Sequence, residues 1–178
     1  MSIIATDLDG TIFKGQTLID GVKEGLDKII NEGIKIYYTT NNSSQTPKEI
    51  KEKLENLLQT NIDISRIITP LVIFQNLYVH SKKKIYIYGS DNLKKYIKRM
   101  NLHVTNLESA DLILIGRKEE NNDFEINEII KNVGLGKNII CLNKDLTFPT
   151  EFGEKPGNGA VVKIIEDNLS IDVPTLGK

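Results

Sequence analysis

Short apolar runs alternate with helical patterns along the whole chain, and this alternation constrains the fold more than any other feature of the sequence. Residues 3–5 and 34–38 have the character of buried strands, and residues 66–69 form a third short run. The intervening apolar residues recur at helical spacing, and residues 46–49, Thr-Pro-Lys-Glu, are typical of a helix start. Alternating strands and helices predict an α/β fold, with a parallel sheet and helices on both of its faces.

A second α/β series begins after the charged segment at residues 81–84. The runs at residues 85–88, 112–115 and 139–142 are expected to be strands, with helical patterns between and after them. We therefore predict a second domain at residues 81–172.

The composition excludes several classes of function. The chain of 178 residues has 23 Lys and Arg against 24 Asp and Glu, which gives no electrostatic basis for binding nucleic acid or an anionic membrane. No apolar stretch approaches the ~20 residues of a membrane helix, and the N-terminus does not resemble a secretory signal, so we expect a cytoplasmic protein. The only cysteine, Cys141, excludes an intrachain disulfide and is expected to be a buried strand residue.

Two carboxylates follow the first apolar run, in the segment Asp7-Leu8-Asp9-Gly10-Thr11. Strand periodicity places Asp7 and Asp9 on the same side. Two such charges are unfavourable together unless a cation shares them, and a hard, oxygen-seeking ion such as Mg²⁺ would do so. Gly10 lets the backbone turn sharply and approach a ligand closely. The layout suits phosphoryl transfer, in which one carboxylate attacks phosphorus and the other moves the proton.

Other interpretations of this segment compete. Asp-Gly is also a common turn dipeptide, so a purely structural turn stays open beside the catalytic pair. An EF-hand loop starting at Asp7 fails, because it needs glycine at Ile12 and glutamate at Leu18. A phosphate-cradling P-loop has two glycines at the right spacing but Gln16 where its lysine is required.

Hydroxyl and amide side chains are dense after the second apolar run, in Thr39-Thr40-Asn41-Asn42-Ser43-Ser44. The carboxyl ends of neighbouring parallel strands lie at the same edge of a sheet. We therefore expect residues 39–44, the hydroxyl loop, to lie beside residues 7–11, the acidic loop. Its donors could hold phosphate oxygens without adding charge. An ordinary Asn/Ser loop is the alternative, but the two loops together favour a phosphate site.

These segments resemble the motifs of the haloacid dehalogenase (HAD) superfamily, and in particular its NagD-like, or p-nitrophenyl phosphatase-like, branch. The resemblance is carried, in the order of the family, by residues 7–11, 40–47, 142–145, 156–160 and 176–178. A dinucleotide-binding fingerprint at Gly157-Asn158-Gly159 fails, because Val162 stands at the third glycine position. Packing or a tight helix start explains these glycines better.

The resemblance implies a role for each matching residue of the two loops. Asp7 would be the nucleophile and a ligand of Mg²⁺. Asp9 would be the general acid and base and would also hold the metal, through its backbone carbonyl. Thr40 and Asn41 would bind the phosphoryl group, together with backbone amides. Gly10 is also predicted to be a phosphate-binding residue.

The resemblance also implies the architecture. Residues 1–80 would be the N-terminal part of a parallel Rossmann-like HAD core, incomplete with strands one to three. Residues 81–172 would be an inserted α/β cap domain, and residues 173–178 would return to the core. Lys178 would pair with Asp7 and the phosphate. Asn143 and Asp145 are candidates for contact with the leaving group, with a simple turn after a strand as the alternative.

The family pattern continues beyond Lys178, with strands that flank strand one and acids that complete the magnesium site. Strand one is therefore expected to be a bare apolar edge, and the chain alone to associate with itself, as a homo-oligomer or an aggregate. A Mg²⁺-dependent phosphatase of small phosphomonoesters is the main hypothesis. A truncated or noncatalytic binding module and a subunit that needs a partner chain are the alternatives.

Overall fold

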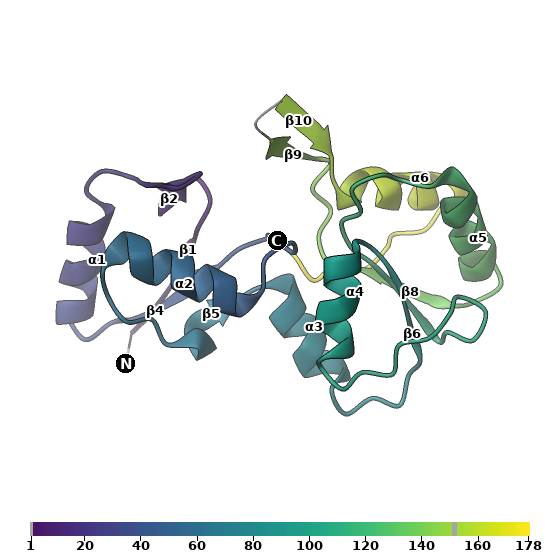
Figure 1. Cartoon of the computed structure of the whole chain (residues 1–178), viewed down its shortest axis with the longest axis horizontal. Helices are drawn as coiled ribbons and strands as arrows, with labels where there is room; N and C mark the ends of the chain where they lie inside the picture. The colour runs from purple at the N-terminus through teal and green to yellow at the C-terminus, as the bar shows by residue number, and fades with distance from the viewer. Residues whose placement is uncertain (1, 151–152) are drawn as a thin grey trace. The chain divides into compact units, whose positions relative to one another are not determined.

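The chain folds into two compact units, Met1–Val72 and Ile73–Lys178 (Figure 1). The computed structural model describes residues 2–150 and 153–178. The division between the units falls inside helix α3 (Pro70–Tyr78). These units are compact parts of the chain, and the predicted domain limits, 1–80, 81–172 and 173–178, stay a prediction.

The first unit contains a three-stranded sheet, two helices and a short hairpin. Its elements are β1 (Ile3–Asp7), β2 (Phe13–Lys14), β3 (Thr17–Leu18), α1 (Val22–Asn31), β4 (Lys35–Thr39), α2 (Pro47–Leu58), the single turn η1 (Ile64–Arg66) and β5 (Ile67–Ile68). The strands expected near residues 3–5, 34–38 and 66–69 are confirmed, as is the helix start at residues 46–49. The β2–β3 hairpin was not expected from the sequence.

The sheet of the first unit has the order β1-β4-β5, and all its strands are parallel. Alternate residues of β4, Ile36 and Tyr38, share one apolar core with Leu26 of α1 and Leu54 of α2. Helix α1 connects β1 to β4, and α2 connects β4 to β5, so both connections run in the same direction along the sheet. Because such connections are right-handed, both helices lie on the same face. The expectation of helices on both faces is therefore not met by α1 and α2.

Strand β1 lies at the edge of this sheet. Its first three residues are exposed, with Ile3 61% and Ile4 37% exposed, and its last two are half-buried. The expectation of a buried first strand is wrong, because among the described residues β1 pairs only with β4. The expected bare apolar edge is confirmed.

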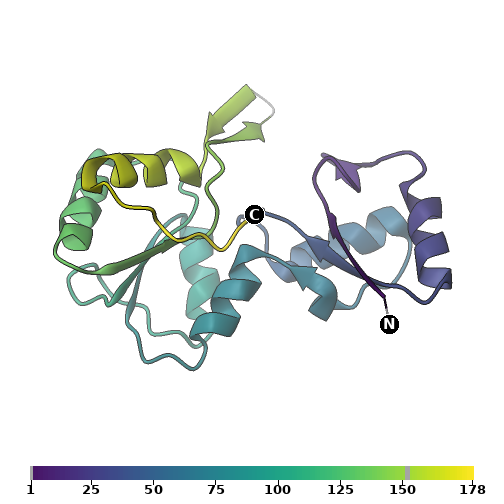
Figure 2. The same ribbon diagram turned by 180° about the vertical axis from the view of Figure 1, so that it is seen from behind.

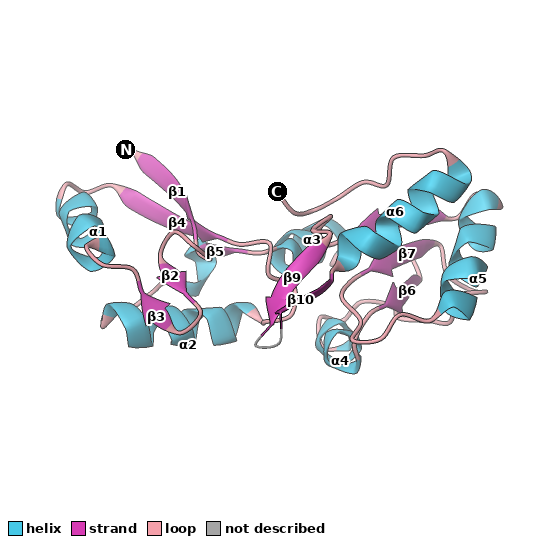
Figure 3. Cartoon of the chain, turned by 90° about the horizontal axis from the view of Figure 1, so that it is seen from above, coloured by secondary structure: helices cyan, strands magenta, loops and turns pink. Residues whose placement is uncertain are grey.

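Within residues 73–150 and 153–178, the second unit contains a second parallel sheet, three helices of its own and a hairpin. Its elements are β6 (Ile85–Tyr88), α4 (Asp91–Lys98), β7 (Leu112–Ile115), α5 (Asp123–Gly134), β8 (Asn138–Cys141), β9 (Thr147–Thr150), β10 (Gly153–Pro156) and α6 (Asn158–Leu169). The three strands expected in this half of the chain are confirmed. Helices α5 and α6 lie side by side, and β9 pairs with β10 in an antiparallel hairpin (Figure 3).

The sheet of the second unit has the order β6-β7-β8 and is buried more deeply than that of the first. All four residues of β7 are buried, as is typical of a parallel strand covered on both faces. One face packs on α5 and α6, through a core that includes Ile113, Ile129 and Ile165. Cys141 is fully buried, as expected.

The last residues of the chain run along the free side of β8 (Figure 2). The backbone N–H of Cys141 donates to the carbonyl of Pro174 at 2.9 Å, and the N–H of Leu176 donates to the carbonyl of Cys141 at 3.0 Å. This segment therefore extends the sheet by a short parallel bridge. None of the helices in the described part of the chain combines the length and the apolarity that a membrane span requires.

Candidate active site

The acidic loop begins where β1 ends and is closed by its own backbone. The carbonyl of Leu8 accepts hydrogen bonds from the N–H groups of Thr11, Ile12 and Phe13 at 3.2, 2.9 and 3.2 Å. The N–H of Gly10 donates to the carbonyl of Phe13 at 2.8 Å. Gly10 has a φ of +81°, a conformation that residues with a Cβ rarely adopt. The sharp turn expected at Gly10 is confirmed, and the loop holds the carboxylate-bearing segment in one conformation.

The hydroxyl loop lies beside the acidic loop, as expected from the parallel sheet. Asp7 is paired with Thr39 in the register of β1 and β4. The hydroxyl of Thr40 donates to Oδ2 of Asp9 at 3.3 Å and accepts from the N–H of Asn42 at 3.0 Å. Thr40 is only 5% exposed, so this hydroxyl is held between the two loops. Residues predicted independently from two segments of the sequence thus meet in the first unit.

Side chains also fix the remainder of the hydroxyl loop. Oδ1 of Asn42 accepts from the N–H and the hydroxyl of Ser44 at 2.9 and 2.7 Å, and from the N–H of Gln45 at 3.3 Å. The following helix starts with a reciprocal capping box between Thr46 and Glu49. Asn41, the second predicted phosphate-binding residue of this loop, is half-buried. The loop is therefore preorganised before any ligand binds.

The donor set of the two loops fits Mg²⁺. Asp7 is half-buried and Asp9 is exposed, and both offer the oxygen ligands that Mg²⁺ prefers. No group of three or more His, Cys, Asp and Glu side chains gathers into a metal cluster within residues 2–150 and 153–178. This is compatible with Mg²⁺, which is commonly held by one or two carboxylates and keeps water and substrate phosphate as its other ligands.

The predicted cap residues lie in a turn after β8. Asn143 is 7% exposed, and its Oδ1 accepts from the N–H of Asp145 at 3.4 Å. The start of α6 packs closely on this turn, since a Cβ at Gly157 would lie 2.3 Å from the carbonyl oxygen of Asp145. Close packing as the reason for the glycines at 157 and 159 is thereby confirmed. Contact of Asn143 and Asp145 with a leaving group stays a prediction.

Lys178 belongs to the second unit, whereas Asp7 belongs to the first. The N–H of Gly177 donates to the hydroxyl of Thr175 at 3.3 Å, which turns the chain just before this lysine. The predicted pairing of Lys178 with Asp7 and phosphate stays a prediction.

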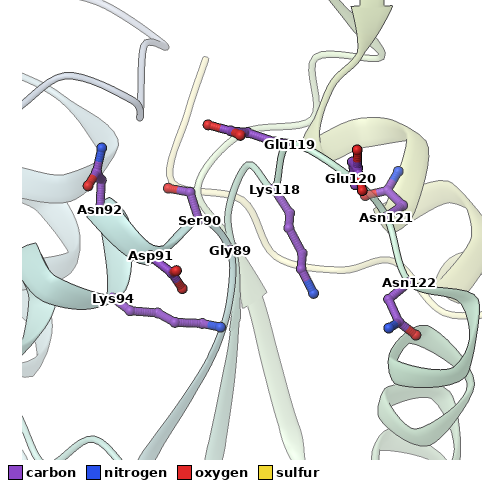
Figure 4. Close-up of a pocket in the computed structure, with 10 residues that line it drawn as sticks. All are labelled: Gly89, Ser90, Asp91, Asn92, Lys94, Lys118, Glu119, Glu120, Asn121 and Asn122. Atoms are coloured by element: carbon purple, nitrogen blue, oxygen red, sulfur yellow. The ribbon is translucent and has the colours of Figure 1, made fainter.

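A polar pocket of about 470 Å³ in the second unit was not expected from the sequence. It lies beyond the carboxyl ends of β6 and β7, between the starts of α4 and α5 (Figure 4). Lys94 and Lys118 extend into it, and Lys118 pairs with Glu125. The only sequence signal was two polar segments after apolar runs, at residues 89–92 and 118–122.

Sequence reasoning also missed a buried amide near the predicted cap residues. Asn158, at the start of α6, is 3% exposed, and its Nδ2 has no hydrogen-bond partner among the described residues. Such a group is unusual inside a protein. In the sequence, this position is recognisable only as part of a glycine-rich helix start.

Fold and site together define the class of protein. It is a Rossmann-like α/β protein, in which carboxylates and hydroxyls gather at the carboxyl ends of adjacent parallel strands, the usual ligand position of such sheets. The family profile described as haloacid dehalogenase-like hydrolase matches residues 4–103, more than half of the chain.

Relatives agree with this profile. An acid sugar phosphatase from Staphylococcus epidermidis is 31% identical over 97% of this chain and 67% of its own length. The solved structure of a mutant thermostable p-nitrophenylphosphatase from Bacillus stearothermophilus is 27% identical, with a TM-score of 0.79 over 98% of this chain and 68% of that one. A glycerol phosphate phosphatase from Mycobacterium tuberculosis, solved with magnesium, has the same fold, with 23% identity and a TM-score of 0.80 over 99% of this chain and 54% of that one.

The chain belongs to the haloacid dehalogenase-like hydrolase family, in its NagD-like and p-nitrophenyl phosphatase-like branch. It spans about two thirds of the length of the curated relatives that it matches.

Proposed function

We propose that this protein is a Mg²⁺-dependent phosphatase that hydrolyses small phosphate monoesters through an aspartyl-phosphate on Asp7. The observation that carries the proposal is the hydrogen bond from Thr40 to Asp9, which joins the acidic and hydroxyl loops. The family membership and the phosphatase names of the relatives support it.

The residues of the first unit can carry both halves of the reaction. In the first half, a carboxylate oxygen of Asp7 attacks phosphorus, the bond to the ester oxygen breaks, and Asp9 gives a proton to the departing alcohol. In the second half, water attacks the aspartyl-phosphate, Asp9 takes its proton, and inorganic phosphate leaves. The closed backbone of the acidic loop supports this assignment, because it holds Asp7 and Asp9 in a fixed relation.

Two further groups complete the proposed site. The Thr40 hydroxyl and the amides of the following loop would donate hydrogen bonds to the phosphoryl oxygens. Mg²⁺ would be held by Asp7 and Asp9 and would supply positive charge that offsets the charge of the phosphoryl group. The oxygen donor set of the loops supports this choice of ion.

Sugar phosphates are the substrate class that we propose to test first. The Staphylococcus epidermidis relative is named an acid sugar phosphatase. Glycerol phosphate is the second class, because a protein of the same fold is named for it.

Hydrolysis of p-nitrophenyl phosphate, with and without Mg²⁺, tests the proposal. We expect metal-dependent turnover that is lost in Asp7→Asn and retained in the control Asp27→Asn, which changes an exposed carboxylate on α1. Absence of turnover in the unchanged protein, or full activity of Asp7→Asn, would contradict the proposal.

A second pair of variants tests the hydroxyl loop. Thr40→Val removes the hydroxyl that donates to Asp9, and we expect kcat to fall roughly 100-fold, as for the loss of a donor in other active sites. Thr39→Val removes a neighbouring hydroxyl that donates to the carbonyl of Thr6 instead, and should leave kcat within about twofold. Equal effects of the two substitutions would argue against a role of Thr40 in the reaction.

A further inference from the structure

Lys53, on helix α2, lies over the ring of Phe13, the residue whose backbone closes the acidic loop. Its side chain is half-buried, and its Nζ lies 3.5 Å from the centre of the Phe13 ring. Phe13 is 3% exposed, so the ammonium group rests on a ring that is itself part of the core. An ammonium group over an aromatic face is held electrostatically, and more firmly when it is partly desolvated.

The ring that holds Lys53 is covalently part of the turn that carries Asp9. The carbonyl of Phe13 accepts from the N–H of Gly10 at 2.8 Å, and its N–H donates to the carbonyl of Leu8 at 3.2 Å. Asp9 and Phe13 also form an isolated backbone bridge. Movement of the Phe13 backbone would therefore change the turn at Asp9 and Gly10.

The charge of Lys53 is also related to the acidic loop. Burial lowers the pKa of Lys53, and the negative charge of Asp9 acts in the opposite direction. The other two lysines of α2 pair with acids of their own helix: Lys48 Nζ lies 3.7 Å from Glu52, and Lys51 Nζ lies 2.6 Å from Glu55. Lys53 differs from them because the opposite charge that acts on it comes from the acidic loop.

We propose that Lys53 is a positioning residue of the active site, which anchors the acidic turn through the Phe13 ring and provides a fixed positive charge beside Asp9. The inference rests on the proposed function, because it assigns Asp9 to the reaction. Nothing in the sequence pattern assigns this role to Lys53, which stands among five charged residues between residues 48 and 53.

Two consequences follow from the position of this charge. Without a metal, the ammonium group offsets part of the negative charge of the acidic loop. With a metal, it repels the second positive charge, so it weakens Mg²⁺ binding while it keeps the turn in place. Loss of Lys53 should therefore tighten Mg²⁺ binding and lower kcat, two effects that a merely structural lysine would not combine.

The test compares Lys53→Met, Lys53→Arg and the control Lys48→Met, which removes an exposed lysine from the same helix. Mg²⁺ affinity is measured without substrate, from the amide shifts of residues 7–10 in NMR spectra. We expect Lys53→Met to bind Mg²⁺ roughly threefold more tightly, the effect of removing one partly screened unit charge. Lys53→Arg and Lys48→Met should bind Mg²⁺ as the unchanged protein does.

Turnover of p-nitrophenyl phosphate supplies the second readout. We expect kcat of Lys53→Met to fall about tenfold with little change of KM, as when an interaction needed in the transition state is lost, and Lys53→Arg to restore it. Unchanged Mg²⁺ affinity in Lys53→Met, or equal effects of Met and Arg, would overturn the inference. Absence of turnover in the unchanged protein would overturn the proposed function instead, and the Mg²⁺ titration would still decide the role of Lys53.

Discussion

Gly157 and Gly159 allow close packing at the start of helix α6, because neither residue has a Cβ. A Cβ at Gly159 would lie 2.1 Å from the carbonyl oxygen of Lys144, and one at Gly157 would lie 2.3 Å from that of Asp145. The N–H of Gly159 donates to the carbonyl of Asp145 at 2.9 Å. The two glycines therefore allow the turn after β8 to pack directly on the first turn of α6 and to accept a hydrogen bond from it. This contact holds Asp145, one of the two residues predicted to face the leaving group.

Replacement of Gly159 by alanine should destabilise the second unit. The new methyl group meets backbone, which cannot move aside as a flexible side chain would, so we expect a loss of roughly 2–4 kcal/mol in the free energy of unfolding. The matched control is Gly25→Ala in α1, where a Cβ meets nothing within 4 Å and should raise stability by up to ~1 kcal/mol. Urea unfolding measures both, and equal stability of the two variants would contradict the packing argument.

At the residue scale, the sequence was sufficient for groups that carry their own chemical pattern. The placement of Asp7 and Asp9 beside the Thr40 loop could be predicted because these segments follow apolar runs that form adjacent parallel strands, and the roles of these residues stay predictions. Lys53 could not, because a lysine on a helix usually faces solvent, and its partner Phe13 lies in a hairpin of two-residue strands that has no clear sequence signature.

The two ends of helix α2 are fixed by side chains that are close in sequence. Its first turn is closed by the capping box of Thr46 and Glu49. Near its last turn, Oε1 of Glu55 accepts from Nζ of Lys51 at 2.6 Å and from the N–H of Ile62 at 2.9 Å. Local patterns of this kind explain why α2 was the helix with the best predicted start. Glu55 also connects the helix to the segment that leads into β5, a contact that no sequence pattern indicates.

Glu55 should make the stability of the first unit depend on pH. Its pKa is lowered in the folded protein by the hydrogen bond from Lys51 and then by that from Ile62. A lowered pKa contributes stability above the ordinary glutamate value of about 4.3 and loses it as pH falls through the folded value. The unchanged protein should therefore exceed Glu55→Gln in unfolding free energy at neutral pH, and the difference should disappear in acid.

Unfolding in urea between pH 7 and pH 3 measures this difference. Glu52→Gln is the matched control, because its carboxylate lies on the same helix and pairs with the exposed Lys48, at 3.7 Å. If the difference in unfolding free energy between the unchanged protein and Glu55→Gln stayed constant down to pH 3, the role of the Glu55 carboxylate in stability would be contradicted.

At the scale of elements, strand number was easier to predict than strand burial. The three strands of each sheet follow from apolar runs, but β1 and β7 have similar runs and differ completely in exposure. The difference arises because β7 has a neighbouring strand on each side, whereas β1 has one neighbouring strand in the described part of the chain. Position within a sheet is a property of the assembled chain and cannot be read from five consecutive residues.

At the scale of the whole molecule, β1 forms the edge of the first sheet in the described part of the chain. An exposed apolar edge strand presents unpaired backbone groups that can join another chain. Ile3 and Ile4 add exposed apolar surface to this edge. Self-association through β1 is therefore expected at raised protein concentration.

Sedimentation velocity over a range of concentrations tests this expectation. Ile3→Lys should reduce association, because a charged edge residue opposes strand pairing. Phe124→Lys is the control, since Phe124 is 77% exposed but lies on helix α5 rather than on a sheet edge. A single monomer boundary for the unchanged protein at all concentrations would refute the idea, as would equal effects of both substitutions.

The last residues of the chain pair with β8 at Cys141, and the thiol of this residue can report on unfolding of the second unit. Burial raises the pKa of Cys141, although a hydrogen bond with Thr175 acts in the opposite direction, so little reactive thiolate is present in the folded state. A thiol reagent can reach this sulfur only when the second unit opens. The rate of alkylation therefore measures the opening of the second unit alone, and no label has to be introduced.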